Sequence, residues 1–166
     1  MDKLSKKDIK DIPYFSFNDI TKECYVIKVY DADTITVVIE LPKLDIEKKI
    51  FRLYKLKLRL DGLDTPEIKG KSDKEKKYAI NARDWLRDCI LDTYISVDLF
   101  KFDKYGRTLC KIYDKERKVC YNDLILDNGL GVLYNGGKKQ LFEDWFNEDK
   151  VNDFLKKEHN RKYNIV

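Results

Sequence analysis

Alternation of apolar and polar residues is the clearest pattern in the first part of the chain. Two β-branched runs, 25–29 and 35–39, flank a short acidic turn, and the run 54–60 alternates strictly. Period-two alternation is typical of strands that bury one face, and two such runs around a tight turn predict a hairpin. Two further runs, 95–102 and 108–113, are also strand-like. The pattern therefore predicts five strands.

A helical pattern replaces the alternation after residue 70. Ser72 and Glu75 have the spacing of a helix capping box. The apolar residues behind them recur at helical spacing: Tyr78, Ala82, Trp85, Leu86, Cys89 and Ile90. We also predict a shorter helix over 122–128, ended by Gly129, and helical structure over 141–162. Five strands and about three α-helices indicate a mainly β, α+β fold, for which an OB-fold five-stranded β-barrel is the simplest candidate.

The chain divides into an arm and one domain. Residues 1–18 are charged and then aromatic around a proline, and we interpret them as an N-terminal arm that packs back through its rings. Residues 19–166, including a C-terminal helix, form the predicted domain, because 166 residues is about one domain's worth of chain. The charged stretch from Pro42 to Lys49 is interpreted as a loop or a strand extension.

Composition excludes several kinds of chemistry. The 34 basic and 30 acidic residues leave a net charge of only +4, which excludes a histone-like polycation. Aromatic residues make up 13% of the chain, which argues against disorder. His159 is the only histidine, so histidine-ligated zinc and Ser–His–Asp catalysis are nearly excluded. An enzyme of this composition would work with carboxylates and arginines.

The cysteines and the apolar segments bear on location. The four cysteines show no CxxC spacing, and no apolar stretch resembles a secretory leader or a membrane span. We expect an intracellular, reduced and monomeric protein with no membrane partner.

Two acidic turns stand out, at residues 31–34 and 61–67. Each has a structural explanation by itself, because aspartate is common in turns. Together they place Asp33, Asp64 and Glu67 after or between strands, so that all three can lie on the same rim of a barrel. Oxygen ligands without imidazole or thiolate suit Ca²⁺ or Mg²⁺.

Two arginines complement the carboxylates. Arg59 lies in the strictly alternating strand, and Arg107 ends the loop 103–107. Each is explained equally well as a solvated strand or turn residue. A guanidinium binds phosphate oxygens through two parallel hydrogen bonds and stays charged. Carboxylates, a hard cation and two arginines are the equipment for phosphoryl transfer.

The same residues give the chain a family resemblance. The segments 29–34, 59–67 and 103–107 occur in the order found in staphylococcal nuclease-like (thermonuclease, SNase-type) domains, with a helix between the second and third. The residues 122–129 and the ending 162–165 also resemble that family. The resemblance covers about residues 20–166 and implies an OB-fold nuclease.

The resemblance implies a role for each matching position. Asp33 and Asp64 would bind one Ca²⁺ ion through their side chains, and Thr65 would bind it through its carbonyl. Glu67 would hold or deprotonate the attacking water. Arg59 and Arg107 would bind the phosphate and stabilise the transition state. Lys104, Tyr105 and Tyr134 would line the nucleotide pocket.

The substrate expectation follows from the same family. We expect hydrolysis of DNA and possibly RNA, single-stranded in either case, with cleavage of the bond to the 5′-oxygen and 3′-phosphate products. The sequence departs from the family at Ala32, where glycine is usual. If that position needs a positive φ, alanine would cost about 1–2 kcal/mol.

Two other functions remain open on the sequence. A non-catalytic module that binds nucleic acid or peptide would have the same fold. A calcium-stabilised structural domain would explain the carboxylates but neither arginine.

Overall fold

The five predicted strands form a closed barrel. The computed structural model describes residues 16–17, 20–42 and 51–163. The barrel strands are β1 (Ile20–Asp31), β2 (Thr34–Pro42), β3 (Phe51–Leu60), β5 (Tyr94–Phe102) and β6 (Thr108–Tyr113). They are paired in the order β1-β2-β3-β6-β5, and β5 closes the barrel against β1. All pairs are antiparallel except β3 with β6, which is parallel. The prediction of an α+β fold with a five-stranded barrel is confirmed.

Alternation along the strands fills the barrel. The β-branched and leucine positions of the sequence pattern point inward, and they include Val37, Ile39, Leu58, Leu60 and Ile112, each at most 1% exposed. Lys55 and Lys57, which alternate with these positions on β3, are exposed, as expected for a strand with one buried face. Apolar burial of this kind is the main stabilising contribution to a domain of this size.

Helix α2 (Asp73–Ile90) connects the first strands to β5. Its N-cap is Ser72, whose side chain accepts a hydrogen bond from the Glu75 backbone N–H at 3.1 Å. The apolar stripe is buried, with Ala82, Leu86 and Ile90 at most 1% exposed. The helix predicted from the capping box and the stripe is therefore present.

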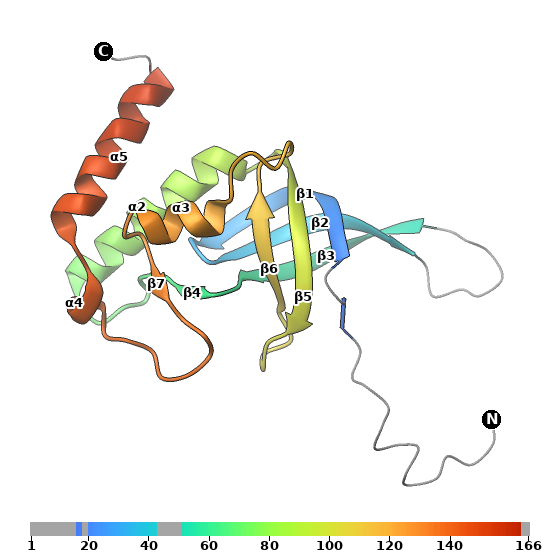
Figure 1. Cartoon of the computed structure of the whole chain (residues 1–166), viewed down its shortest axis with the longest axis horizontal. Helices are drawn as coiled ribbons and strands as arrows, with labels where there is room; N and C mark the ends of the chain where they lie inside the picture. Colours follow the sequence, from blue (N-terminus) through green and yellow to red (C-terminus); the bar gives the residue numbers. More distant parts are fainter. Residues whose placement is uncertain (1–15, 18–19, 43–50, 164–166) are drawn as a thin grey trace, which may run out of the picture.

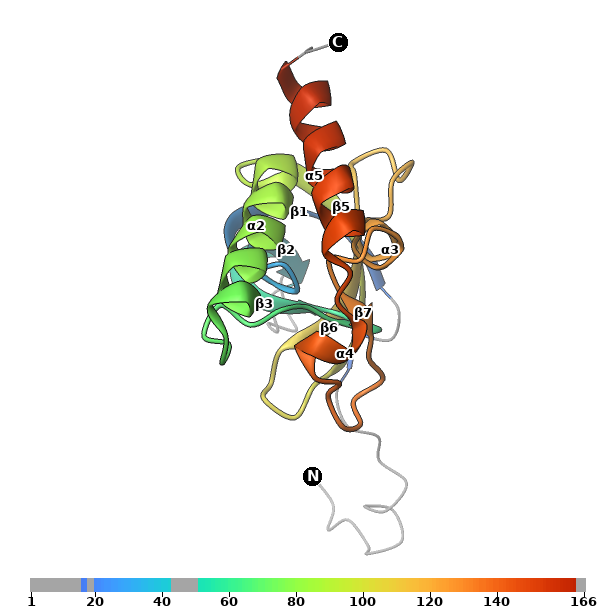
Figure 2. The same cartoon turned by 90° about the vertical axis from the view of Figure 1, so that its left-hand side faces the viewer.

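The C-terminal segment is divided where a single helical stretch was expected. After α3 (Tyr121–Asp127), the chain forms the four-residue α4 (Phe142–Trp145) and then α5 (Glu148–Tyr163). The described residues thus contain four helices, one more than predicted. At the junction the Phe146 ring centroid lies 4.5 Å from that of Tyr78 and 4.3 Å from that of Phe142, and the Asn147 side chain accepts from the Lys150 backbone N–H at 3.0 Å at the start of α5. Figures 1 and 2 show α2, α3, α4 and α5 on one side of the barrel.

A two-stranded pair joins this helical side to the barrel. β4 (Leu63–Asp64) pairs with β7 (Val132–Leu133), and Asp64 lies opposite Val132. Gly131 makes the close approach possible, because a Cβ atom there would lie 2.8 Å from the Asp64 carbonyl oxygen. β7 therefore holds the chain directly beside the second acidic turn.

Two predicted segments lie largely outside the described residues. These are the N-terminal arm, apart from Ser16 and Phe17, and the stretch after Pro42. Phe17 is buried, and its ring centroid lies 5.7 Å from that of Phe102. Within residues 16–17, 20–42 and 51–163, no helix is long and apolar enough to cross a membrane.

Candidate active site

Strand register brings the separate sequence motifs to one rim of the barrel. Thr34, the last residue of the first acidic turn, lies opposite Arg59 in the β2–β3 pair. Arg59 in turn lies beside Leu109 in the parallel β3–β6 pair, next to the loop that ends at Arg107. The Leu60 N–H donates to the Asp33 carbonyl at 2.8 Å. The expectation that the two acidic turns share a rim therefore agrees with the register, which also brings both arginines to that rim.

Arg59 is at the centre of this rim, and it is buried. Although it lies on the lysine-bearing face of β3, it is only 8% exposed. Its guanidinium donates to the Asp33 carboxylate and to the Asp64 carboxylate, the latter at 2.8 Å. Burial opposes its charge, but the neighbouring Asp33 and Asp64 outweigh this effect and raise the pKa of Arg59. Arg59 is therefore a permanent cation that links the two acidic turns.

A second cation, Lys139, also binds the carboxylates. Its ammonium lies 2.8 Å from Asp64 Oδ1 and 2.6 Å from Glu67 Oε1. Burial lowers the pKa of Lys139, but its hydrogen bonds to Asp64 and Glu67 outweigh this and raise it overall. Lys139 was not among the residues predicted from the sequence, because it lies in the loop after Gly136 and Gly137 and belongs to no recognisable motif.

The loop between β5 and β6 is organised around Asp103. Its carboxylate accepts from the backbone N–H groups of Tyr105 at 2.8 Å and Arg107 at 2.9 Å, and from Arg107 Nε at 2.7 Å. Burial raises the pKa of Asp103, but these hydrogen bonds outweigh burial and lower it overall. The Arg107 guanidinium also lies 5.5 Å from the Tyr105 ring centroid and 3.4 Å from the Thr34 hydroxyl. Asp103 thus fixes the turn that presents Tyr105 and Arg107.

The position of Glu67 depends on helix α2. The Glu75 carboxylate accepts hydrogen bonds from the backbone N–H groups of Lys71 at 3.0 Å and Glu67 at 3.3 Å. Gly70 leaves room for it, because a Cβ atom there would lie 2.3 Å from the Glu75 carboxylate. The Glu67 side chain is 54% exposed and faces the cavity. The acidic residue of the capping box therefore anchors the loop that carries Glu67.

These groups surround a cavity of about 690 Å³. The predicted site residues that line it are Arg59, Glu67, Lys104, Tyr105, Arg107 and Tyr134. An adjoining hollow of about 490 Å³ shares five of them, the exception being Glu67. Tyr105 is 71% exposed, and the Lys104 ammonium lies 5.1 Å from its ring centroid. Tyr134 is positioned by its N–H, which donates to the Gly62 carbonyl at 3.0 Å.

The predicted metal ligands lie behind this cavity. Asp33, Asp64 and Thr65 are each at most 8% exposed. Asp31 Oδ1 is buried without a hydrogen-bond partner within the described residues, which leaves a carboxylate oxygen for a further positive group. Burial and the Asp33 charge raise the pKa of Asp31 to about 8. The donor chemistry therefore fits a hard divalent cation such as Ca²⁺.

The carboxylates do not form a ready-made metal cage. Within residues 16–17, 20–42 and 51–163, no three His, Cys, Asp or Glu side chains are grouped closely enough to hold a metal ion. Asp33 and Asp64 pair instead with Arg59, and Asp64 and Glu67 pair with Lys139. The positive charges that balance these carboxylates therefore come from two side chains, Arg59 and Lys139.

Alanine fits the first acidic turn without backbone strain. The non-glycine residues with positive φ in the described chain are Asp92 and Arg117, and Ala32 is not among them. Ala32 is 1% exposed and belongs to the hydrophobic core. The conditional cost of a positive φ does not arise, and the methyl group packs in the core.

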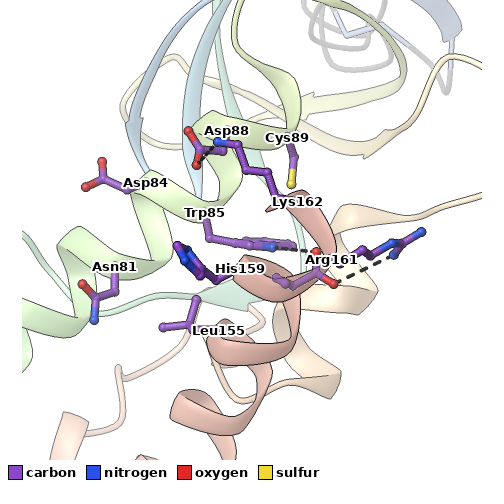
Figure 3. Close-up of a pocket in the computed structure, with 10 residues that line it drawn as sticks. Asn81, Asp84, Trp85, Asp88, Cys89, Leu155, His159, Arg161 and Lys162 are labelled. Atoms are coloured by element: carbon purple, nitrogen blue, oxygen red, sulfur yellow. Dashed lines mark hydrogen bonds and ion pairs between the residues drawn. The ribbon is translucent and has the colours of Figure 1, made fainter. Parts of the chain in front are cut away.

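The single histidine lies elsewhere. A hollow of about 650 Å³ separates parts of α2 and α5 (Figure 3). His159 lines it together with Trp85 and Leu155, and the Lys162 ammonium bridges it to Asp88 at 2.7 Å. No predicted site residue lines this hollow.

The comparison with protein families agrees with this geometry. The family model described as "Staphylococcal nuclease homologue" matches residues 57–162, which is more than half of the chain. This chain belongs to the staphylococcal nuclease family. The match includes Arg59, the second acidic turn, Arg107 and the cavity segment that carries Lys139.

Curated relatives of this staphylococcal nuclease homologue carry endonuclease names. "Endonuclease Htp3" of Saprolegnia parasitica is 30% identical over 152 residues, covering 78% of this chain and 71% of that protein. "Probable endonuclease LCL3" of Yarrowia lipolytica is 33% identical over 114 residues, covering 61% of this chain and 50% of the relative. The chain spans between 28% and 54% of the length of the LCL3 relatives it matches.

Solved structures with a similar course of the chain include extended Tudor domains. The domain TD3 from mouse TDRD1, in complex with a MILI peptide, aligns with a TM-score of 0.49 and 7% identity, covering 75% of this chain and 97% of that one. The extended Tudor domain of Drosophila Tudor-SN aligns with a TM-score of 0.39 and 11% identity, covering 94% and 76%. At these scores the structures carry no argument about function.

Proposed function

We propose that this protein hydrolyses phosphodiester bonds of DNA and possibly RNA in a calcium-dependent reaction at the Arg59–Glu67–Arg107 cavity. The observation that carries the proposal is the joint placement of two arginines and three carboxylates at one rim. Arg59, Glu67 and Arg107 line the same cavity, while Asp33 and Asp64 contact Arg59 from behind it. The endonuclease names of the relatives support the same reaction class.

The metal would be held by the buried carboxylates. Asp33 and Asp64 would supply side-chain oxygens, and Thr65 would supply its carbonyl oxygen to one Ca²⁺ ion. A bound Ca²⁺ would polarise the phosphoryl group and lessen the cost of its developing charge. Because the three residues are buried, the ion would sit against a low-dielectric wall, where its charge has the greatest effect.

The arginines would bind the phosphate and stabilise its transition state. Each guanidinium has five N–H donors, so Arg59 can donate to a phosphate as well as to its two aspartates. Arg107 is oriented by Asp103, which fixes the Nε side of its guanidinium. Arg59 comes from β3 and Arg107 from the β5–β6 loop, so they can contact different oxygens of one phosphate.

Glu67 would direct the attacking water. Its carboxylate is half-exposed at the cavity, where it can accept a proton or a hydrogen bond from water. The water oxygen attacks phosphorus while Glu67 accepts one of the water protons. The bond from phosphorus to the 5′-oxygen breaks, and that oxygen takes up a proton from solvent. The products are a 3′-phosphate and a 5′-hydroxyl.

The nucleotide would occupy the exposed side of the cavity. Lys104 and Tyr105 line it on the β5–β6 loop, and Tyr134 lines it on the segment after β7. Aromatic rings stack with bases of any sequence, and lysine attracts the backbone. A single-stranded substrate, whose bases are free to stack, suits this arrangement.

The proposal is tested by cleavage of an end-labelled single-stranded oligonucleotide in Ca²⁺, Mg²⁺ or excess chelator. We expect cleavage in Ca²⁺, no cleavage in chelator, and 3′-phosphate ends. Glu67→Gln should lower the rate at least 100-fold, while Glu143→Gln, an exposed change on α4, should leave it unchanged. Full activity in chelator would contradict the metal assignment.

The alternative is a non-catalytic module that binds nucleic acid or peptide. It predicts binding of the same oligonucleotide in Ca²⁺ without turnover. A calcium-stabilised structural domain predicts a higher melting temperature in Ca²⁺ with neither binding nor cleavage. The same protein preparation distinguishes all three outcomes.

A further inference from the structure

Lys139 forms ion pairs with two carboxylates of the candidate active site, those of Asp64 and Glu67. Its ammonium bridges Asp64 Oδ1 and Glu67 Oε1 at 2.8 and 2.6 Å. Under the proposed function, on which this inference rests, Asp64 would hold Ca²⁺ and Glu67 would hold the water. The lysine therefore binds both groups that the reaction needs.

The contact at Asp64 uses up one oxygen. Asp64 Oδ1 accepts from Arg59 at 2.8 Å and also from Lys139 at 2.8 Å. A carboxylate oxygen has about two lone-pair directions, so these two donors saturate it. Direct coordination of a metal by this oxygen requires at least one donor to leave.

Lys139 is the donor that can leave at lower cost. The Arg59 side chain is 10% exposed and is enclosed by two aspartates, whereas the Lys139 side chain is 46% exposed. Lysine carries its charge on a flexible four-carbon stem and is strongly hydrated in water. Release of Arg59 would leave a buried charge unpaired, which is far more costly.

We propose that Lys139 is an intramolecular competitor of the divalent cation. In the metal-free protein its ammonium balances the charges of Asp64 and Glu67, and coordination of Ca²⁺ by Asp64 Oδ1 displaces it. The lysine therefore stabilises the metal-free state and weakens the apparent Ca²⁺ affinity. The Glu67 carboxylate is released from its ion pair with Lys139 only when the metal is bound and the lysine has moved away.

Calorimetric titration of the full chain with Ca²⁺ tests this directly, without measuring catalysis. Lys139→Met should lower the Kd for Ca²⁺ about 3- to 10-fold, the range expected for losing a partly exposed ion pair to two carboxylates. Lys139→Arg keeps the charge and should keep a Kd close to that of the wild type. Lys138→Met, which removes the same charge from the adjacent exposed residue, should change Kd less than twofold.

Thermal unfolding provides a second test, in which Lys139→Met should lower the stability of the metal-free protein although it strengthens Ca²⁺ binding. In chelator, Lys139→Met should unfold about 1–4 °C below the wild type, because Asp64 and Glu67 lose a partner. In saturating Ca²⁺ that difference should shrink or reverse. A lysine that merely positions the loop would instead lower both the stability and the Ca²⁺ affinity.

Each outcome decides the proposal. Weaker Ca²⁺ binding by Lys139→Met, or a shift equal to that of Lys138→Met, overturns the competition while leaving the proposed nuclease intact. If none of the variants nor the wild type binds Ca²⁺, the metal dependence of the proposed function fails and this inference fails with it.

Discussion

The guanidinium of Arg59 and the carboxylate of Asp33, 26 residues apart in the chain, form a buried ion pair at the rim of the barrel. The same guanidinium also binds Asp64. One side chain therefore holds together the two acidic turns that we assign to the metal. Arg59 therefore links the two turns even when no phosphate is bound.

Replacement of Arg59 should expose this structural role. Arg59→Met leaves two buried carboxylates without their cation, and we expect the free energy of unfolding to fall by about 3–5 kcal/mol in chelator. Urea denaturation measures the loss. Excess Ca²⁺ should restore part of it, since a metal can replace the missing charge.

A surface arginine supplies the matched control. Arg83 pairs with the half-exposed Asp84 at 2.8 Å, so Arg83→Met should cost less than about 1 kcal/mol. Equal losses for the two variants would contradict a special role of Arg59.

Asp103 should stabilise the β5–β6 loop and its arginine. Asp103→Asn loses the charge that binds Arg107 and two backbone N–H groups, and we expect a cost of about 1–2 kcal/mol at pH 7. Oligonucleotide binding should weaken as well, because Tyr105 and Arg107 lose their fixed turn. Asp153→Asn, an exposed change on α5, is the control.

The pH dependence of this effect has a definite sign. The folded-state pKa of Asp103 is lowered, so its contribution to stability is present above the unfolded value and is lost as pH falls through the folded value. The stability gap between wild type and Asp103→Asn should therefore be full at pH 7 and close below about pH 4. A gap of the same size at pH 3 would argue against a charged Asp103 as its source.

Glu75 should act on the reaction through the Glu67 loop. Glu75→Ala removes the acceptor for the Glu67 and Lys71 N–H groups, and we expect kcat to fall about 10-fold with a smaller change in KM. Steady-state cleavage kinetics measure both constants. Glu75→Gln, which keeps one acceptor oxygen, should recover part of the rate.

A variant of Asp73 serves as the control that distinguishes positioning of the Glu67 loop from stabilisation of the N-terminus of α2. Asp73 occupies the same first turn of α2 without a hydrogen bond to the Glu67 backbone. Asp73→Ala should therefore leave kcat near the wild-type value. Loss of activity in both variants to the same degree would assign the effect to the helix instead.

Asn122 should be a major stabilising polar residue. It is 2% exposed, and its side chain binds the backbone of Asp61, Cys110 and Ile112 at 3.0, 3.3 and 3.0 Å. Asn122→Ala leaves these groups unpaired, and we expect a loss of about 2–4 kcal/mol by urea denaturation. Asn128→Ala, which removes one bond at the half-buried end of α3, should cost less.

Local pattern was sufficient to predict the five barrel strands, α2 and α3, but not the short strands β4 and β7. Alternation in 54–60, the stripe behind Ser72 and the glycine after α3 depend on residues close in sequence. Each reflects a local property: strand pleating, helical spacing or a left-handed backbone at Gly129, whose φ is +71°. The division between α4 and α5 escaped prediction; at this junction Phe146 packs against Tyr78, a residue far away in the chain.

At the candidate site, the contributions of the sequence and of the tertiary structure can be told apart. By itself, the sequence determined the residue types of the three motifs and their order, because short-range spacing and chemistry are written directly in the chain. Only the tertiary structure decided that Arg59 is buried between Asp33 and Asp64, and that Lys139 reaches Asp64 and Glu67. The charge balance of a site depends on distances and burial across segments far apart in sequence, and no local pattern encodes those.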